Sequence, residues 1–377
     1  MVIPKPNRLK GLLKFLAVLG LLYIFLVSIS LMGAAFKSFG KGFAENLIRT
    51  TSNPFVGLFI GLLVTSIIQS SSTTTSMIVG FVAGGVLTIE NAIPMIMGAN
   101  IGTSVTNTIV SLGHITRKEE FKRAFSGALI HDIFNIIVVL ILFPLELATG
   151  YLRRVASLMA NVFQGMGGLK VTSPIKVIVK PAVHFVEGLF RSAFPDKSTL
   201  TGIFMLVLAL LALFFALFFL VKIIKSLIAT KTEVAIYNML GKSGIRAMIL
   251  GIVLTAIVQS SSVTTSILVP LLGAGIITME MALPVTLGAN VGTTVTAILA
   301  SLTGNVQGIV IAFAHLAFNI TGILLIYPIK RIRAIPIFLA RKIGEKGANN
   351  RFFAIIYVAS IFFIIPGLLV FIASIFR

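Results

Sequence analysis

The 377-residue sequence contains no cysteine, which excludes a disulfide framework and a thiolate metal site. It also contains few charges. Asp, Glu, Lys and Arg make up 11% of the residues, whereas a soluble domain carries about 25%. Hydrophobic residues make up 57% of the chain. This composition is typical of a polytopic membrane protein, because most of the chain has to be surrounded by lipid or by other apolar segments.

The formal net charge of +20 does not indicate a nucleic-acid-binding protein, because the bases form no single recognition face. No Lys or Arg lies between Arg49 and Arg117, or between Arg246 and Lys330. The bases cluster near the ends of apolar segments, a distribution that orients membrane helices. The basic N-terminus resembles a signal peptide, but the apolar stretch that follows is too long for one. We therefore expect a retained helix and a cytoplasmic N-terminus.

One uncharged polar stretch occurs twice inside apolar sequence, at residues 69–76 and at residues 259–266. A single such stretch would fit a solvated loop equally well. The similarity extends further, because residues 65–106 and 255–296 are identical at 22 of 42 positions. Four later positions also match, at His131, Phe134, Asn135 and Pro144 against His315, Phe318, Asn319 and Pro328. The chain therefore contains an internal repeat of roughly 90 residues, and its polar stretches must face protein, water or a ligand.

The apolar segments predict an all-α polytopic membrane protein. We expect crossings at residues 11–31, 92–112, 121–144, 203–224, 282–302, 309–329 and 352–376. The segment from Pro54 to Gln69 spans only about 24 Å as a helix, less than the bilayer core of about 30 Å. Each polar stretch is therefore predicted to lie in a re-entrant helical hairpin. Glycines on both sides of Asn100, in residues 98–103, favour an unwound turn, so the crossing at 92–112 and its repeat copy are predicted to be interrupted.

An odd number of crossings separates the start of repeat 1 from the start of repeat 2, so the two repeats are predicted to be inverted. This is the architecture of secondary transporters, in which the substrate binds between the repeats. The predicted units are an N-terminal transmembrane unit, 1–146, with repeat 1 at 53–146; an extracytoplasmic connector, 147–200; and a second transmembrane unit, 201–377, with repeat 2 at 244–330 and a C-terminal helix. A further amphiphilic connector is expected at 37–52, amphipathic helices at 147–200, and an external C-terminus.

The chemistry of the two polar stretches suits both an anion and a hard cation. Ser and Thr are good helix N-caps, and the free N–H groups at a helix N-terminus attract anions. Gln69 and Gln259 each add an amide donor and a carbonyl acceptor. Hydroxyl and carbonyl oxygens suit sodium, and no histidine or thiolate cluster indicates a transition metal. Because the stretches contain no Arg to offset an anion's charge, cation-coupled anion transport is the physically sensible prediction.

Six segments of the sequence resemble the type II sodium–phosphate cotransporters. They are residues 69–72, 94–108, 121–125, 131–135, 259–262 and 287–294. The resemblance extends over roughly residues 53–351 and implies sodium-driven uptake of inorganic phosphate as the divalent anion, by alternating access. The connector is short and free of cysteine, unlike the long disulfide-bearing connector of vertebrate relatives, so the resemblance implies a bacterial member located in the inner (plasma) membrane.

The same resemblance implies the site residues. The expected phosphate-binding residues are Gln69, Ser70, Ser71, Ser72, Asn100, Gln259, Ser260, Ser261, Ser262 and Asn290. The expected sodium-binding residues are Thr74, Thr103, Thr108, Asp132, Asn135, Thr264, Thr265 and Thr293. Sodium is expected as a co-substrate, with no resident cofactor. In the resembled family, electrogenic members carry aspartate at the position of Asp132 and an electroneutral member carries glycine, which implies electrogenic transport here.

Alternative functions remain open at this point. The chain could transport another small oxyanion with sodium, or could form a channel that uses the same hairpins as a filter. A membrane enzyme ranks last, because the repeats contain no cysteine and no convincing set of nucleophile, base and acid. Glu90 and Glu280 lie at predicted helix starts, where acids stabilise the helix dipole. His131 and His315 are expected to be packed and hydrogen-bonded.

Overall fold

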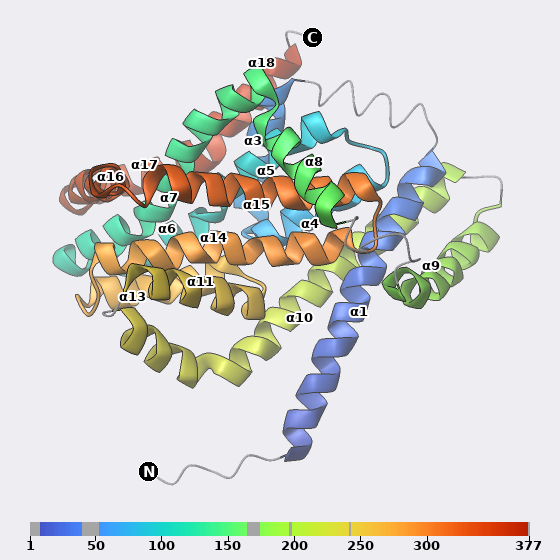
Figure 1. Ribbon diagram of the computed structural model, residues 1–377, viewed down its shortest axis with the longest axis horizontal. Helices are drawn as coiled ribbons and strands as arrows, with labels where there is room; N and C mark the ends of the chain where they lie inside the picture. The colour runs from blue at the N-terminus through green and yellow to red at the C-terminus, as the bar shows by residue number, and fades with distance from the viewer. Residues whose placement is uncertain (1–7, 40–52, 164–173, 196–197, 241–242, 376–377) are drawn as a thin grey trace.

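The computed structural model describes residues 8–39, 53–163, 174–195, 198–240 and 243–375 (Figure 1). Every regular element in these ranges is helical, as the sequence predicts. The helices are α1 Arg8–Phe39, α3 Pro54–Ile68, α4 Ser71–Ala83, α5 Ile89–Thr103, α6 Val105–Leu112, α7 Lys118–Thr149, α8 Tyr151–Phe163, α9 Pro174–Ala193, α10 Ser198–Leu240, α11 Gly244–Val258, α12 Ser261–Ser266, α13 Leu268–Gly273, α14 Met279–Ser301, α15 Val306–Ile326, α16 Lys330–Asn349, α17 Arg351–Ala359, the π-helical turn η2 Ser360–Ile364, and α18 Ile365–Ile375. Most of the amphiphilic connector predicted at 37–52 lies outside the described residues.

Six helical segments in the described part of the chain are long and apolar enough to cross a membrane. They are Leu12–Phe39, Lys118–Thr149, Ser198–Ile223, Met279–Ser301, Val306–Ile326 and Arg351–Ala373. Large apolar side chains project outward from them, such as Leu13 on α1, Leu140 on α7 and Leu211 on α10, each more than half exposed. Exposed leucines at this density are suited to lipid, not water. The chain is therefore a multi-pass membrane protein.

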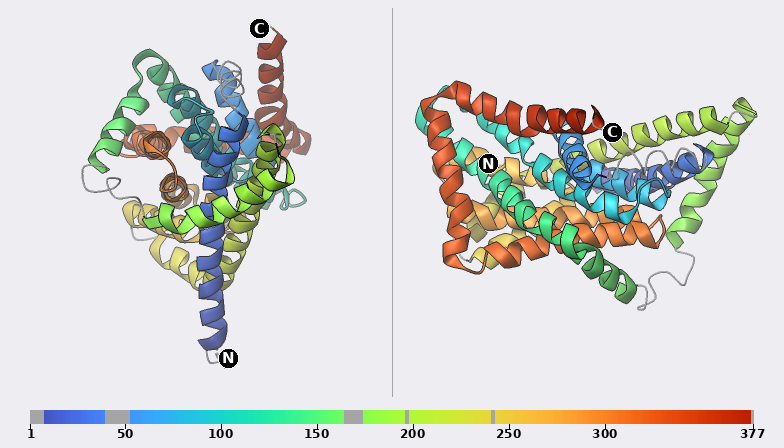
Figure 2. Two further views of the ribbon diagram at one scale, coloured as in Figure 1. Left: turned by 90° about the vertical axis from the view of Figure 1, so that its right-hand side faces the viewer. Right: turned by 90° about the horizontal axis from the view of Figure 1, so that it is seen from above.

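The repeats form a central body against which the other helices pack. Its core includes Phe134 of α7 and Phe318 of α15, which occupy equivalent positions and are each 1% exposed. Outside this body, α1 and α10 lie side by side, and the N-terminal half of α1 extends away from it (Figures 1 and 2). Helices α8 and α9 occupy the predicted connector, and α9 packs against α1.

The unwound turn predicted at residues 98–103 is absent from the described helices of both repeats, although the crossing predicted at 92–112 is interrupted in repeat 1. Helix α5 continues through these residues to Thr103, and the chain breaks one residue later, at Ser104, before α6. Its counterpart α14 is continuous from Met279 to Ser301. The glycines serve close helix packing: a Cβ on Gly98 would lie 1.8 Å from the Leu58 carbonyl oxygen, and one on Gly288 would lie 2.0 Å from that of Met248. They allow α5 to pack on α3 and α14 on α11.

The short helices predicted around the polar stretches are confirmed, with shifted boundaries in the first repeat. Helix α3 has 15 residues and α4 has 13, and α4 begins at Ser71, inside the polar stretch at 69–76. In the second repeat the returning arm is split at Ile267 into α12 and α13. Pro270 accounts for the split, because its nitrogen cannot donate to the carbonyl of residue 266, four positions earlier.

Polar contacts between helix ends and loops fall into two groups. At one end, the Glu90 carboxylate, at the start of α5, pairs with Arg153 on α8 at 2.6 Å. At the same end, the Asn305 amide donates to the carbonyl of Ala83, which closes α4, at 3.2 Å. Thr88, the residue that precedes α5, supplies the N-cap side chain of that helix, so Glu90 adds a charge to an already capped first turn.

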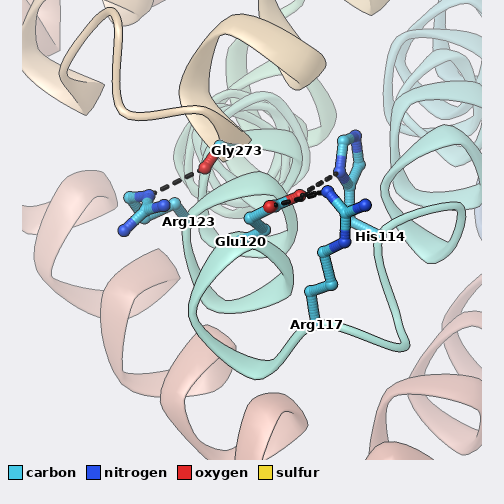
Figure 3. A network of polar contacts seen from close by, with 5 residues as sticks. All are labelled: His114, Arg117, Glu120, Arg123 and Gly273. Atoms are coloured by element: carbon cyan, nitrogen blue, oxygen red, sulfur yellow. Dashed lines mark hydrogen bonds and ion pairs between the residues drawn. The ribbon is translucent and has the colours of Figure 1, made fainter.

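The second group lies where repeat 2's hairpin meets the loop between α6 and α7 (Figure 3). The Arg123 guanidinium donates from Nε to the Gly273 carbonyl oxygen at 2.8 Å, which joins α7 to the end of α13. Beside it, Glu120 accepts from Arg117 at 2.9 Å and lies 3.5 Å from His114. Helix α16 also joins this end, since Lys122 on α7 pairs with a glutamate of α16 at 3.0 Å.

Candidate functional site

Both polar motifs begin with a glutamine in an unusual backbone conformation. Gln69 ends α3 with φ 56°, and Gln259 ends α11 with φ 59°. They are the two non-glycine residues with positive φ in the described part of the chain. This left-handed conformation after a helix is usually adopted by glycine, and strain of this kind concentrates at functional sites. Keeping glutamine at both turns therefore points to a role for its side chain.

A serine cap follows each glutamine and opens the next helix. The Ser70 hydroxyl accepts from the Thr73 amide at 3.2 Å, and the Ser260 hydroxyl accepts from the Val263 amide at 3.3 Å. One turn later, Thr74 and Thr264 donate their hydroxyls to the carbonyls of the capping serines. The predicted pairing of each motif with a helix N-terminus is thus present in both repeats.

The two motifs contact each other across the interface between the repeats. The Ser72 hydroxyl donates to the Gln259 backbone carbonyl at 2.9 Å. The Gln259 side-chain carbonyl, in turn, accepts from the Thr296 hydroxyl of α14 at 2.7 Å. Gln259 is 7% exposed, whereas Gln69 is exposed. Equivalent residues therefore have different surroundings: one glutamine is held by partners, and the other is open to a cavity.

The cavity next to Gln69 has a volume of about 550 Å³. Its polar lining comes from both repeats, with Gln69 and Thr106 from the first and Ser260, Ser262 and Ser266 from the second. The Thr106 hydroxyl is buried and has no hydrogen-bond partner among the described residues. The rest of the lining is apolar, from Val110, Val263, Ile267, Pro270 and Leu271. Within the described lining no side chain is charged, so a bound anion would meet neutral donors.

A second polar network joins the repeats deeper in the core, and its contacts are reciprocal. His131 of repeat 1 contacts the Asn290 side-chain oxygen at 2.6 Å, and His315 of repeat 2 contacts the Asn100 side-chain oxygen at 3.3 Å. The amides of Asn135 and Asn319 donate to the backbone carbonyls of Asn100 and Asn290, respectively. Such exchanged pairs are the pattern of a two-fold arrangement. Both histidines are 1% exposed and hydrogen-bonded, as expected.

The predicted site residues are thus divided among several places. Gln69, Ser260 and Ser262 line the cavity, whereas Asn100 and Asn290 belong to the deeper network and not to the described lining. Ser71 and Ser261 are buried in the first turns of α4 and α12. Asn135 lies in the deeper network, where it also accepts from the Asn290 amide. Hydroxyls of four further predicted sodium ligands donate to carbonyls of their own helices, from Thr103, Thr108, Thr265 and Thr293.

Asp132 is fully buried on α7, and both of its carboxylate oxygens accept hydrogen bonds. Ser104 donates to one oxygen at 3.3 Å, and Tyr357 of α17 donates to the other. The tyrosine ring also packs edge-on against Phe125, with ring centroids 6.3 Å apart. A helix outside the repeats therefore completes the surroundings of the one acid predicted to bind sodium.

Sequence reasoning missed several residues that take part in these contacts, among them Thr106, Asn107, Ser266, Thr296 and Tyr357. Thr106 and Thr296 are identical at the repeat offset of 190, and that identity could have identified them. Asn107 has no such signal, because Ala297 occupies the equivalent position. Tyr357 lies beyond the second repeat, where the internal comparison gives no information.

The sequence profile of the family described as Na+/Pi-cotransporter matches residues 24–171 and 211–359, and each matched part contains one polar motif. The chain belongs to the Na+/Pi-cotransporter family. The gap between the two matched parts includes α9 and the start of α10, the region of the predicted connector. No solved structure matches this member of the family.

Curated relatives of this family member include sodium-dependent phosphate transport protein 2A of Rattus norvegicus, which is 37% identical over 428 residues. Sodium-dependent phosphate transport protein 2B of Homo sapiens is 36% identical over 447 residues. Both alignments cover 95% of this chain, but only 67% and 65% of the respective relatives. The chain therefore spans about two thirds of the length of these relatives.

Proposed function

We propose that this protein couples inward movement of sodium to uptake of inorganic phosphate, in its divalent form, across the inner (plasma) membrane. One observation carries the proposal: the two Gln-Ser-Ser-Ser motifs meet at the interface of the repeats and line a neutral polar cavity. Family membership and the names of the relatives support the choice of phosphate and sodium.

Phosphate, in this proposal, binds at the cavity between the motifs. Gln69 offers an amide, and the hydroxyls of Thr106, Ser260 and Ser262 offer further donors from both repeats. The N-terminus of α4 adds a favourable dipole for an anion. With neutral donors alone, two negative charges would remain uncompensated in a low-dielectric site. Sodium ions bound nearby offset those charges, which makes binding of phosphate and of sodium mutually dependent.

Asp132 is the proposed acidic sodium ligand. The other proposed sodium ligands are neutral, namely the hydroxyl and amide oxygens that the sequence predicts. An acid buried in a membrane-spanning helix is costly and functional by default. The hydroxyls of Ser104 and Tyr357 hydrogen-bond the carboxylate and hold it in place. A cation that binds Asp132 has to share the carboxylate with these two donors.

Alternating access follows from treating the repeats as inverted halves. The reciprocal contacts of His131 and His315 support a two-fold relation between the halves. The grouping of loop contacts at two ends supports the predicted topology as well. From the motifs, the cavity continues along Val110 and Leu271 toward the end where Arg123 contacts Gly273 (Figure 3). The predicted topology assigns that end to the cytoplasm, so we propose that the cavity is the cytoplasmic access path.

Uptake of labelled phosphate into proteoliposomes tests the proposal. An inward sodium gradient is compared with equal sodium on both sides and with potassium in place of sodium. A symporter accumulates phosphate above its external concentration only under the gradient. A channel equilibrates phosphate in all three conditions and never accumulates it, and that outcome would reject the symport mechanism.

A further inference from the structure

The two halves of the deep polar network differ in how their buried acceptors are satisfied. In the first half, the His131 Nδ1 atom receives the Asn107 amide at 3.3 Å. The Asn135 side-chain oxygen receives the Asn290 amide at 2.8 Å. Both acceptors therefore have an N–H donor.

The equivalent acceptors in the second half have none. The Nδ1 atom of His315 and the side-chain oxygen of Asn319 are buried without a hydrogen-bond partner among the described residues. The other ring nitrogen of His315 faces the Asn100 side-chain oxygen, an acceptor, so it carries the proton and leaves Nδ1 as a bare lone pair. The Asn319 amide donates to the carbonyls of Asn290 and His315, so its oxygen is the free end.

One position explains the unpartnered atoms of His315 and Ser76, whereas the Asn319 oxygen lacks a donor because Asn100, the equivalent of Asn290, donates to the Ile96 carbonyl at 2.9 Å instead. Asn107 donates to His131 and also accepts from the hydroxyls of Thr265 and Ser266. At the repeat offset of 190, the equivalent of Asn107 is Ala297, which has no polar atom in its side chain. The equivalent of Ser266 is Ser76, whose hydroxyl is also buried and has no partner in the described part of the chain.

Helix α4 brings Ser76 to the same region as α14 and α15. The Ser72 and Thr296 hydroxyls lie 3.5 Å apart, which joins α4 to α14 one residue before Ala297. A Cβ on Gly308 would lie 3.5 Å from the Val79 side chain, so α15 packs against α4 just beyond Ser76. Three orphaned polar atoms thus come from the two helices, α4 and α15, that pack around the position where the first half has an amide.

We propose that this place is a sodium site, formed by the His315 Nδ1 atom, the Asn319 side-chain oxygen and the Ser76 hydroxyl beside Ala297. Two of these groups are pure acceptors and the third can accept, so the set has an excess of lone pairs. A cation satisfies all three at once, as two amide donors do in the other half. The identity of the cation as sodium rests on the proposed function; the site itself rests on the orphaned atoms.

Two variants test the site. Ser76→Ala removes one ligand with little change in volume, and we expect the sodium concentration for half-maximal uptake to rise about tenfold. Ala297→Asn restores the missing amide, which can donate to His315 and accept from Ser76, and we expect a lower Hill coefficient for sodium. The matched control is Ser126→Ala, which removes another buried and unpartnered hydroxyl on a different helix; its sodium dependence should equal that of the wild type.

A second readout separates this site from the proposed function. Sodium, compared with choline and without phosphate, should raise the Tm of the purified wild type and of Ser126→Ala, but raise that of Ser76→Ala much less. If wild-type uptake ignores sodium while this Tm pattern holds, the transport proposal fails and the site stands. If Ser76→Ala matches the wild type in both readouts, a water molecule satisfies these atoms and the site is refuted, whether or not Ala297→Asn folds.

Discussion

Replacing Gln259 by alanine tests the role of the buried glutamine most sharply. The substitution removes the acceptor of the Thr296 hydroxyl and the amide that bonds the Ala256 carbonyl. A buried hydroxyl that loses its partner costs about 1–3 kcal/mol. That range corresponds to roughly 5- to 150-fold in an equilibrium constant. We expect the loss to lower both the thermal stability of the protein and its apparent affinity for phosphate.

Gln69→Ala is the matched variant, because Gln69 holds the same position in the other repeat but is exposed in the cavity. No buried polar group of the described residues loses a hydrogen bond when the Gln69 side chain is removed. We therefore expect its Tm to equal that of the wild type, while phosphate uptake falls by a factor within the same range. Both variants are assayed by thermal unfolding of the purified protein and by sodium-driven uptake in proteoliposomes. Wild-type uptake by Gln69→Ala would remove the glutamine from the phosphate site.

Three further outcomes are expected. Gly288→Ala should abolish folded protein, because the new Cβ would lie 2.0 Å from a backbone carbonyl oxygen. Gly20→Ala, whose new Cβ would have no atom of the described residues within 4 Å, should elute normally in size-exclusion chromatography, and equal yields of the two variants would contradict the packing argument. Asp132→Gly should transport phosphate without net current, because the variant loses the sodium ion proposed to bind at Asp132. One coupled charge is worth about 2.3 kcal/mol per 100 mV, so an unchanged response of uptake to a valinomycin potential would exclude Asp132 from the sodium pathway. Glu280→Gln breaks an exposed ion pair with Arg341 and should change stability by less than about 1 kcal/mol, so a large fall in Tm would show that the pair is not simply solvated.

The hairpins were predictable from the sequence because two local signals agree. A helix that starts at Pro54 and must end before a polar stretch is too short to cross, and the same pattern recurs in the second repeat. Both the short helices and the turns at the glutamines are observed. Because the pattern occurs twice, it predicts a hairpin, whereas a single serine-rich stretch would fit a solvated loop equally well.

The glycines of α5 show where local reasoning fails. A glycine inside a helix lowers its intrinsic stability, and that signal is the same whether the helix unwinds or another backbone approaches closely. Only the position of α3 decides the matter, since Gly98 faces the Leu58 carbonyl. The contact of Tyr357 with Asp132 was equally hidden, because the two residues are 225 positions apart and share no repeat.

Equilibrium binding of labelled phosphate to the purified protein tests the central claim most directly. The account predicts that phosphate binds in sodium but not in potassium, and that the double variant of Gln69→Ala and Gln259→Ala loses this binding while remaining folded in size-exclusion chromatography. Phosphate binding of equal strength in sodium and potassium, or binding retained by the folded double variant, would contradict a sodium-coupled site between the two motifs.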